Sequence, residues 1–112
     1  MASEQLETSA FRLQETTISG IHAAFASGEL SARQLVEYYQ NRIEAYDRNG
    51  PKINSIITVN PRALEEAEEL DRAFSARGVT GMLHGIPVIL KDQIDVRGMP
   101  TTMGSVVFND YF

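Results

Sequence analysis

The chain has 112 residues, of which 43% are hydrophobic and 22% are charged, and this composition predicts a single globular domain rather than a disordered segment. Ten Lys and Arg against 15 Asp and Glu leave a net charge of −5, so the chain lacks the positive field that nucleic-acid binding requires. Cysteine is absent, which excludes disulfides, thiol nucleophiles and zinc sites built on Cys.

The N-terminal residues 1–16 are polar and have neither the basic start nor the apolar stretch of a signal peptide, so we expect an N-terminal arm. The longest apolar run, Ile86–Leu90, is far shorter than the about 20 residues that cross a membrane. These features predict a soluble, cytoplasmic protein without membrane contact.

Two amphipathic helices are predicted in the first half of the chain. The first ends at Gly28, which suits a C-terminal cap, and its shared face comprises Ile18, Ile21, Ala24 and Phe25. The second is predicted over 32–48, because Ser31 and Gln34 have the spacing of a capping box and the run 49–51 (NGP) ends a helix.

A third helix is predicted from Asn60-Pro61, with Asn60 as its cap and Pro61 in its first turn, to Gly78. Its glutamates are expected to form a solvated face rather than a cation site; they are Glu65, Glu66, Glu68 and Glu69.

Short β-branched or apolar runs flank this third helix. Residues 54–59 (NSIITV) and 86–90 (IPVIL) are each predicted to be a buried strand. A strand–helix–strand order of this kind is typical of an α/β architecture with a largely buried sheet.

Sequence motifs for dinucleotides, phosphate loops and the α/β-hydrolase nucleophile are absent. Neither His22 nor His84 belongs to a metal-binding pattern. A structural role beside a glycine turn is expected for His84, and a structural role or a surface position for His22. No cofactor and no metal are therefore expected.

Lys91 is the most informative residue. It directly follows the predicted strand 86–90, at the end of a strand where open α/β sheets bind ligands. A lysine placed there either pairs with Asp92 or Asp95, or is held neutral and serves as a general base. The residues alone leave both interpretations open.

Residues 84–95 read HGIPVILKDQID and residues 98–105 read GMPTTMGS. Together they resemble the amidase signature family, whose members carry a GIPV-x-x-KD segment followed by a G-x-x-TT-x-G-S segment. Residues 27–31 and 53–57 are similar to the family's N-terminal helices and first strand. The resemblance implies the N-terminal part of an α/β/α sandwich, a mixed sheet covered by helices, which is incomplete in this chain and occupies residues 17–112.

The resemblance also implies a catalytic triad of a serine, a second serine on a cis peptide, and a lysine. Lys91 matches the lysine, and Asp92 is expected to have a supporting, orienting role. Thr101, Thr102, Gly104 and Ser105 match a loop that shapes the backbone near the site, and Gln93 replaces an Asn that is common there.

Neither catalytic serine of the family has a counterpart here, because the family's Gly/Ser-rich stretch is missing. None of the serines present matches one: Ser3, Ser9, Ser19, Ser27, Ser31, Ser55, Ser75 and Ser105. We therefore expect the N-terminal fragment of an amidase that hydrolyses small carboxylic amides to acid plus ammonia or amine, and expect this chain to be inactive alone.

Two alternatives remain. The chain is either a non-catalytic interaction module that complements a separate chain, or part of the glutaminase-type A subunit of a tRNA-dependent amidotransferase. In each case 86–90 lacks its neighbouring strands, so self-association through exposed strand edges is expected.

Overall fold

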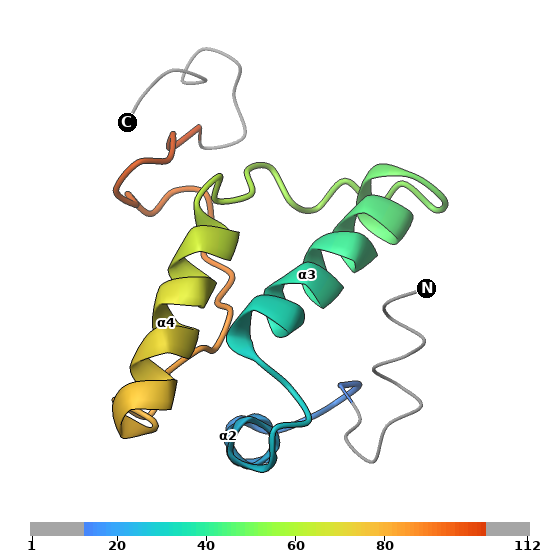
Figure 1. The fold of residues 1–112 in the computed structure, drawn as a ribbon. Helices are drawn as coiled ribbons and strands as arrows, with labels where there is room; N and C mark the ends of the chain where they lie inside the picture. Colours follow the sequence, from blue (N-terminus) through green and yellow to red (C-terminus); the bar gives the residue numbers. More distant parts are fainter. Residues whose placement is uncertain (1–12, 103–112) are drawn as a thin grey trace.

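The regular structure is helical within residues 13–102, the part of the chain that this computed structural model describes. Helix α2 spans Ile18–Ser27, α3 spans Ala32–Arg42 and continues into the π-helix η1 at Ile43–Arg48, and α4 spans Ala63–Arg77. Helices α3 and α4 run in opposite directions, and α2 lies near the end at which α3 begins (Figure 1). None of the helices in this range has the length and apolar character needed to cross a bilayer.

Helix α2 ends at the predicted cap. Gly28 has φ 82°, a left-handed conformation that glycine adopts without strain. At the other end, the Thr17 hydroxyl accepts the N–H of Gly20 at 3.0 Å. Ile18 has the spacing of the buried face but is 44% exposed, and it lines a groove described below. The buried residues of α2 are Ile21, Ala24 and Phe25.

Helix α3 begins at the predicted capping box. The Ser31 hydroxyl accepts the N–H of Gln34 at 3.1 Å, and the Gln34 side chain accepts the N–H of Ser31 at 3.0 Å. The predicted helix over 32–48 is confirmed in extent, although its last six residues wind as the π-helix η1.

Asp71 of α4 completes the start of α3. Its carboxylate oxygens accept the N–H of Ala32 at 2.7 Å and that of Arg33 at 3.1 Å. Amides of the first turn have no partner inside their own helix, and the helix dipole favours a negative charge beside them. An ion pair between Arg33 and Glu68 is a second link between the helices.

Helix α4 begins two residues later than the sequence predicts. The expected cap Asn60 accepts the N–H of Arg62 at 3.0 Å, and the helix starts at Ala63. The Asn60 oxygen therefore closes a turn and does not cap the helix. The glutamates of the first half lie exposed, with Glu68 half-buried, as expected for a solvated face.

The prediction of a strand over 54–59 is wrong for the described part of the chain. Asn54 has φ 54°, which lies outside the β region. The N–H groups of Ser55 and Ile56 donate to the carboxylate of Asp47, at 2.7 and 3.0 Å, rather than to a neighbouring strand.

The prediction of a buried strand over 86–90 also fails in this chain. Among residues 13–102 the one β-bridge joins Val96 to Met99. A strand needs a neighbour for its hydrogen-bond ladder, and no described segment supplies one. The α/β sandwich is therefore not formed by these residues. The apolar side chains remain exposed, with values of 64% for Val88, 81% for Ile89 and 51% for Leu90.

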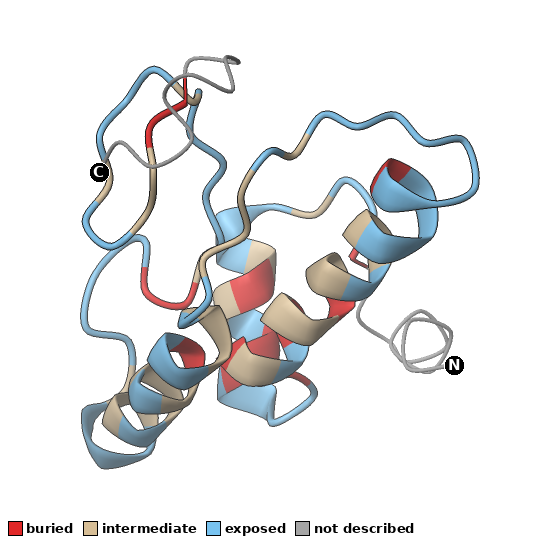
Figure 2. Cartoon of the chain, turned by 90° about the horizontal axis from the view of Figure 1, so that it is seen from above, coloured by how far each residue is buried: buried red, intermediate tan, exposed pale blue. Residues whose placement is uncertain are grey.

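The core lies where the helices face one another, and Figure 2 shows the buried positions on these inner sides. Gly85 brings the chain against this core. It has φ 69°, and a Cβ there would stand 2.8 Å from Cε2 of Phe25, so any other residue would strain the backbone and displace the Phe25 ring. Ile86 then packs against the cluster. The core residues are Leu13, Ile21, Ala24, Phe25, Leu30, Ala32, Leu35, Tyr38 and Ala67.

Candidate functional site

Lys91 directly follows the apolar segment 86–90, and its side chain is exposed. The Lys91 carbonyl accepts the N–H of Ile94 at 3.0 Å, so the chain turns immediately after the lysine. Among the described residues Lys91 forms no ion pair with either Asp92 or Asp95. The alternative in which Lys91 pairs at the end of the segment is therefore not what this structure contains.

The carboxylates of Asp92 and Asp95 instead accept hydrogen bonds from the two threonines of the TT motif. The Thr101 hydroxyl donates to Asp95 at 2.8 Å, and Asp92 accepts both the N–H of Thr102, at 3.1 Å, and its hydroxyl. Both threonines are buried. These contacts close the loop that follows Lys91.

His84 is buried, and both nitrogens of its ring are engaged. Nε2 lies 3.1 Å from the carbonyl oxygen of Leu70, whereas Nδ1 lies 3.3 Å from the N–H of Thr80 and 2.8 Å from its hydroxyl. A carbonyl only accepts and an N–H only donates, so Nε2 carries the proton. The backbone carbonyl of His84 accepts from His22 Nε2 at 2.8 Å. Both histidines therefore support the turn that leads to Lys91.

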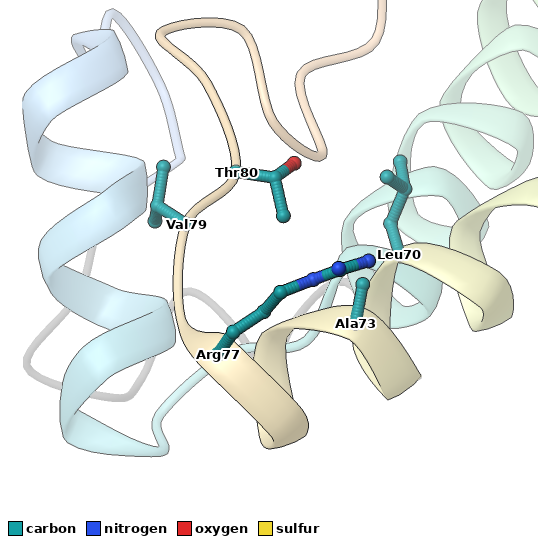
Figure 3. A pocket seen from close by; sticks show the side chains of 5 residues that line it. All are labelled: Leu70, Ala73, Arg77, Val79 and Thr80. Atoms are coloured by element: carbon teal, nitrogen blue, oxygen red, sulfur yellow. The ribbon is translucent and has the colours of Figure 1, made fainter.

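A groove of about 1450 Å³ separates the helices from the two extended segments. Apolar residues of 53–59 and 86–90 line it together with apolar residues of the helices, and Lys91 lies in the same wall. A smaller pocket of about 550 Å³ lies near the end of α4, and Figure 3 shows Leu70, Ala73, Arg77, Val79 and Thr80 around it. Because Lys91 lines only the larger groove, the groove is the candidate site.

Several serines of the described residues make contacts away from Lys91. The Ser55 hydroxyl donates to Asp47 at 2.6 Å, Ser31 caps α3, and Ser27 donates to a carbonyl of α2 at 3.1 Å. Ser3, Ser9 and Ser105 lie outside the described residues, as does Gly104. None of the described serines Ser19, Ser27, Ser31, Ser55 and Ser75 hydrogen-bonds to Lys91.

Asp47 accepts hydrogen bonds from Ser55 and Ile56 in the groove wall, and no motif in the sequence indicated this role. Hydrogen bonds from the Ser55 hydroxyl and then the Ser55 N–H hold the pKa of the Asp47 carboxyl below its usual value. Local spacing rules could not predict this contact, nor that of Asp71 with α3, because each joins segments whose relative placement is set by tertiary packing.

Comparisons with known proteins agree with the motifs around Lys91. The family model described as Amidase matches residues 34–112. A protein of Arabidopsis thaliana named "Probable amidase" is 40% identical over 107 residues, which cover 93% of this chain and 20% of that protein. The A subunit of the glutamyl-tRNA(Gln) amidotransferase of Pelobacter propionicus is 39% identical over 88% of this chain and 20% of the relative.

Solved structures give the same family. The native peptide amidase from Stenotrophomonas maltophilia matches with a TM-score of 0.85 and 40% identity, over 90% of this chain and 21% of that one. An amidase family protein from Bacillus anthracis matches with a TM-score of 0.88 and 32% identity, over 99% of this chain and 21% of that one. The chain therefore spans about a fifth of the length of the relatives that it matches.

Proposed function

This chain belongs to the amidase family, and we propose that it is the N-terminal part of an enzyme that hydrolyses a carboxylic amide to an acid and ammonia or an amine. The observation that carries the proposal is the position of Lys91. It lies in the wall of the apolar groove, between the glycine turn at Gly85 and the threonine pair held by Asp92 and Asp95.

In the proposed reaction Lys91 is the base of a Ser–cisSer–Lys triad, whose serines are supplied by the rest of the domain. Its neutral amine takes the proton of the nucleophilic serine, through the bridging serine, as the serine oxygen attacks the carbonyl carbon of the amide. The proton then passes to the nitrogen of the leaving group as the C–N bond breaks. Water hydrolyses the acyl-enzyme through the same relay, and no metal or cofactor takes part.

The 112-residue chain alone is proposed to be inactive. Lys91 is exposed to water, and no described serine lies in hydrogen-bond contact with it. Both serines of the proposed triad come from the rest of the domain, so the reaction requires it.

The experiment that tests this function uses a chimera in which this chain replaces the matching fifth of the Stenotrophomonas peptide amidase. Release of ammonia from a simple carboxamide is measured for the chimera and for the chain alone. The proposal predicts turnover by the chimera and none by the chain alone. Turnover by the chain alone that is lost in Lys91→Ala contradicts it.

A second candidate is the glutaminase component of a tRNA-dependent amidotransferase, which hydrolyses glutamine. The observation that favours it is the 39% identity to the Pelobacter protein, nearly the same as the identity to the Arabidopsis protein. Replacing the matching fifth of the Pelobacter protein with this chain tests it. Ammonia released from glutamine by this second chimera, and none from the carboxamide by the first, favours the second candidate.

A further inference from the structure

Asn49 and Gly50 form the exposed turn at which η1 ends. Asn49 has an extended backbone, with φ −119° and ψ −167°, and both residues are exposed. Gly50 has φ 53°, and a Cβ there would stand 2.6 Å from the carbonyl oxygen of Ala45, so any other residue would strain the turn. The turn therefore requires a glycine directly after an exposed asparagine.

An asparagine in this setting loses its side-chain amide without an enzyme. The backbone nitrogen of the next residue attacks the amide carbon Cγ, the Cγ–Nδ2 bond breaks, and ammonia leaves with the proton that the backbone nitrogen gives up through the solvent. Water then opens the cyclic imide and leaves an aspartate or an isoaspartate. Ring closure needs a following N–H that no hydrogen bond engages, and it is least hindered when the following residue has no side chain.

The following N–H is free after Asn49 and engaged after Asn54. Within the described residues the Gly50 N–H forms no hydrogen bond. The Ser55 N–H, which follows Asn54, donates to the Asp47 carboxylate at 2.7 Å. Asn54 is as exposed to solvent as Asn49, so the engagement of the following N–H distinguishes the two asparagines as well as the glycine does.

The other two asparagines of residues 13–102 also lack an available N–H. Asn60 is followed by Pro61, whose ring nitrogen carries no hydrogen. Asn41 lies inside α3, where the N–H of Arg42 belongs to the helical hydrogen-bond ladder. We propose that Asn49 is a site of spontaneous deamidation, and that the fold restricts the reaction to this asparagine among those of the described residues.

Deamidation changes the contacts at the end of η1. Asn49 Nδ2 donates to the carbonyl and to the carboxylate of Glu44, both at 2.9 Å and both at the surface, so the side chain can exchange these partners for water and turn toward Gly50. The product carries a carboxylate, which donates no hydrogen bond and repels that of Glu44. Its charge also lies at the C-terminal end of a helix, which the helix dipole disfavours. Deamidation therefore loosens the turn that leads into the groove segment 53–59.

The test follows each asparagine of the purified chain by peptide mass spectrometry during incubation at neutral and mildly alkaline pH. The proposal predicts that conversion at Asn49 exceeds that at Asn54 by an order of magnitude or more, and that it is faster at the higher pH because the attacking nitrogen must lose its proton. The same incubation in concentrated urea frees the Ser55 N–H. Conversion at Asn54 then rises several-fold, so the ratio of the Asn49 rate to the Asn54 rate falls, while Asn60 remains unreactive.

Conversion at Asn49 that is as slow as at Asn60 in the folded chain overturns the proposal. An equal ratio of the Asn49 and Asn54 rates with and without urea overturns the role of the fold. The structural consequence is tested by Asn49→Asp, which should lower the urea midpoint of unfolding, with a smaller loss in a Glu44→Gln background because the repulsion is then removed. An Asn49→Asp variant as stable as its parent contradicts the loosening of the turn.

Discussion

Gly85, the glycine of the GIPV motif, offers a quantitative test of how the structure places the site. In Gly85→Ala the new Cβ stands 2.8 Å from Cε2 of Phe25 and 3.3 Å from Cβ of Ala32, in a backbone with φ 69°. The left-handed conformation costs an alanine about 1–2 kcal/mol. Overpacking a core adds about 1–3 kcal/mol, because the Phe25 ring, which packs edge-on against Phe74, must move.

The matched control is Gly28→Ala. Gly28 has a similar φ of 82°, but no atom lies within 4 Å of its Cβ position, so this variant loses only the backbone contribution of about 1–2 kcal/mol. Urea unfolding followed by the helical circular-dichroism signal measures both variants. We expect Gly85→Ala to lose about 1–3 kcal/mol more stability than Gly28→Ala. Equal losses in the two variants would refute the close approach of Gly85 to the core.

Three further predictions concern the acidic side chains. Asp71→Ala removes two acceptors from the first turn of α3 and should lower the free energy of unfolding by about 1–3 kcal/mol in urea titrations, whereas a loss below about 0.5 kcal/mol contradicts the capping role. Because the pKa of Asp47 is lowered in the folded state, the stability it contributes is present above the unfolded-state pKa of about 3.9 and is lost as pH falls through the folded-state value. Asp47→Asn should therefore reduce the loss of stability that is measured below about pH 4. Identical acid-unfolding profiles of the variant and its parent would contradict this role of Asp47. Thr101→Val removes the hydroxyl that donates to Asp95 and should speed amide hydrogen exchange in the loop after Lys91, while unchanged exchange would show that the contact does not order the loop.

Local signals predicted the helices well because their determinants lie within a few residues. The capping box at Ser31 and the glycine at Gly28 appear at the expected ends of helices. The helix at 32–48 is right in extent, yet its change to π winding has no local signature. The prediction for Asn60 is wrong, because the same side-chain oxygen serves either a helix cap or an Asx turn.

The predicted strands failed for a different reason. Residues 54–59 and 86–90 have strand composition, but strand structure depends on partners elsewhere in a domain, and the described residues do not contain them. At the candidate site, the position of Lys91 after an apolar segment followed from the sequence. The hydrogen bond from Thr101 to Asp95 could not be predicted from the sequence, because the two residues meet only once the loop between them has closed.

The measurement that tests the central claim most directly is kcat/KM for amide hydrolysis by the peptide-amidase chimera with each lysine of this chain replaced in turn. The sequence contains two lysines, Lys91 in the groove wall and Lys52 in the exposed connection after η1. If Lys91 is the general base, Lys91→Ala lowers kcat/KM by about 10²–10⁴-fold while Lys52→Ala leaves it unchanged. A Lys91→Ala chimera that folds and keeps the activity of its parent would contradict the account.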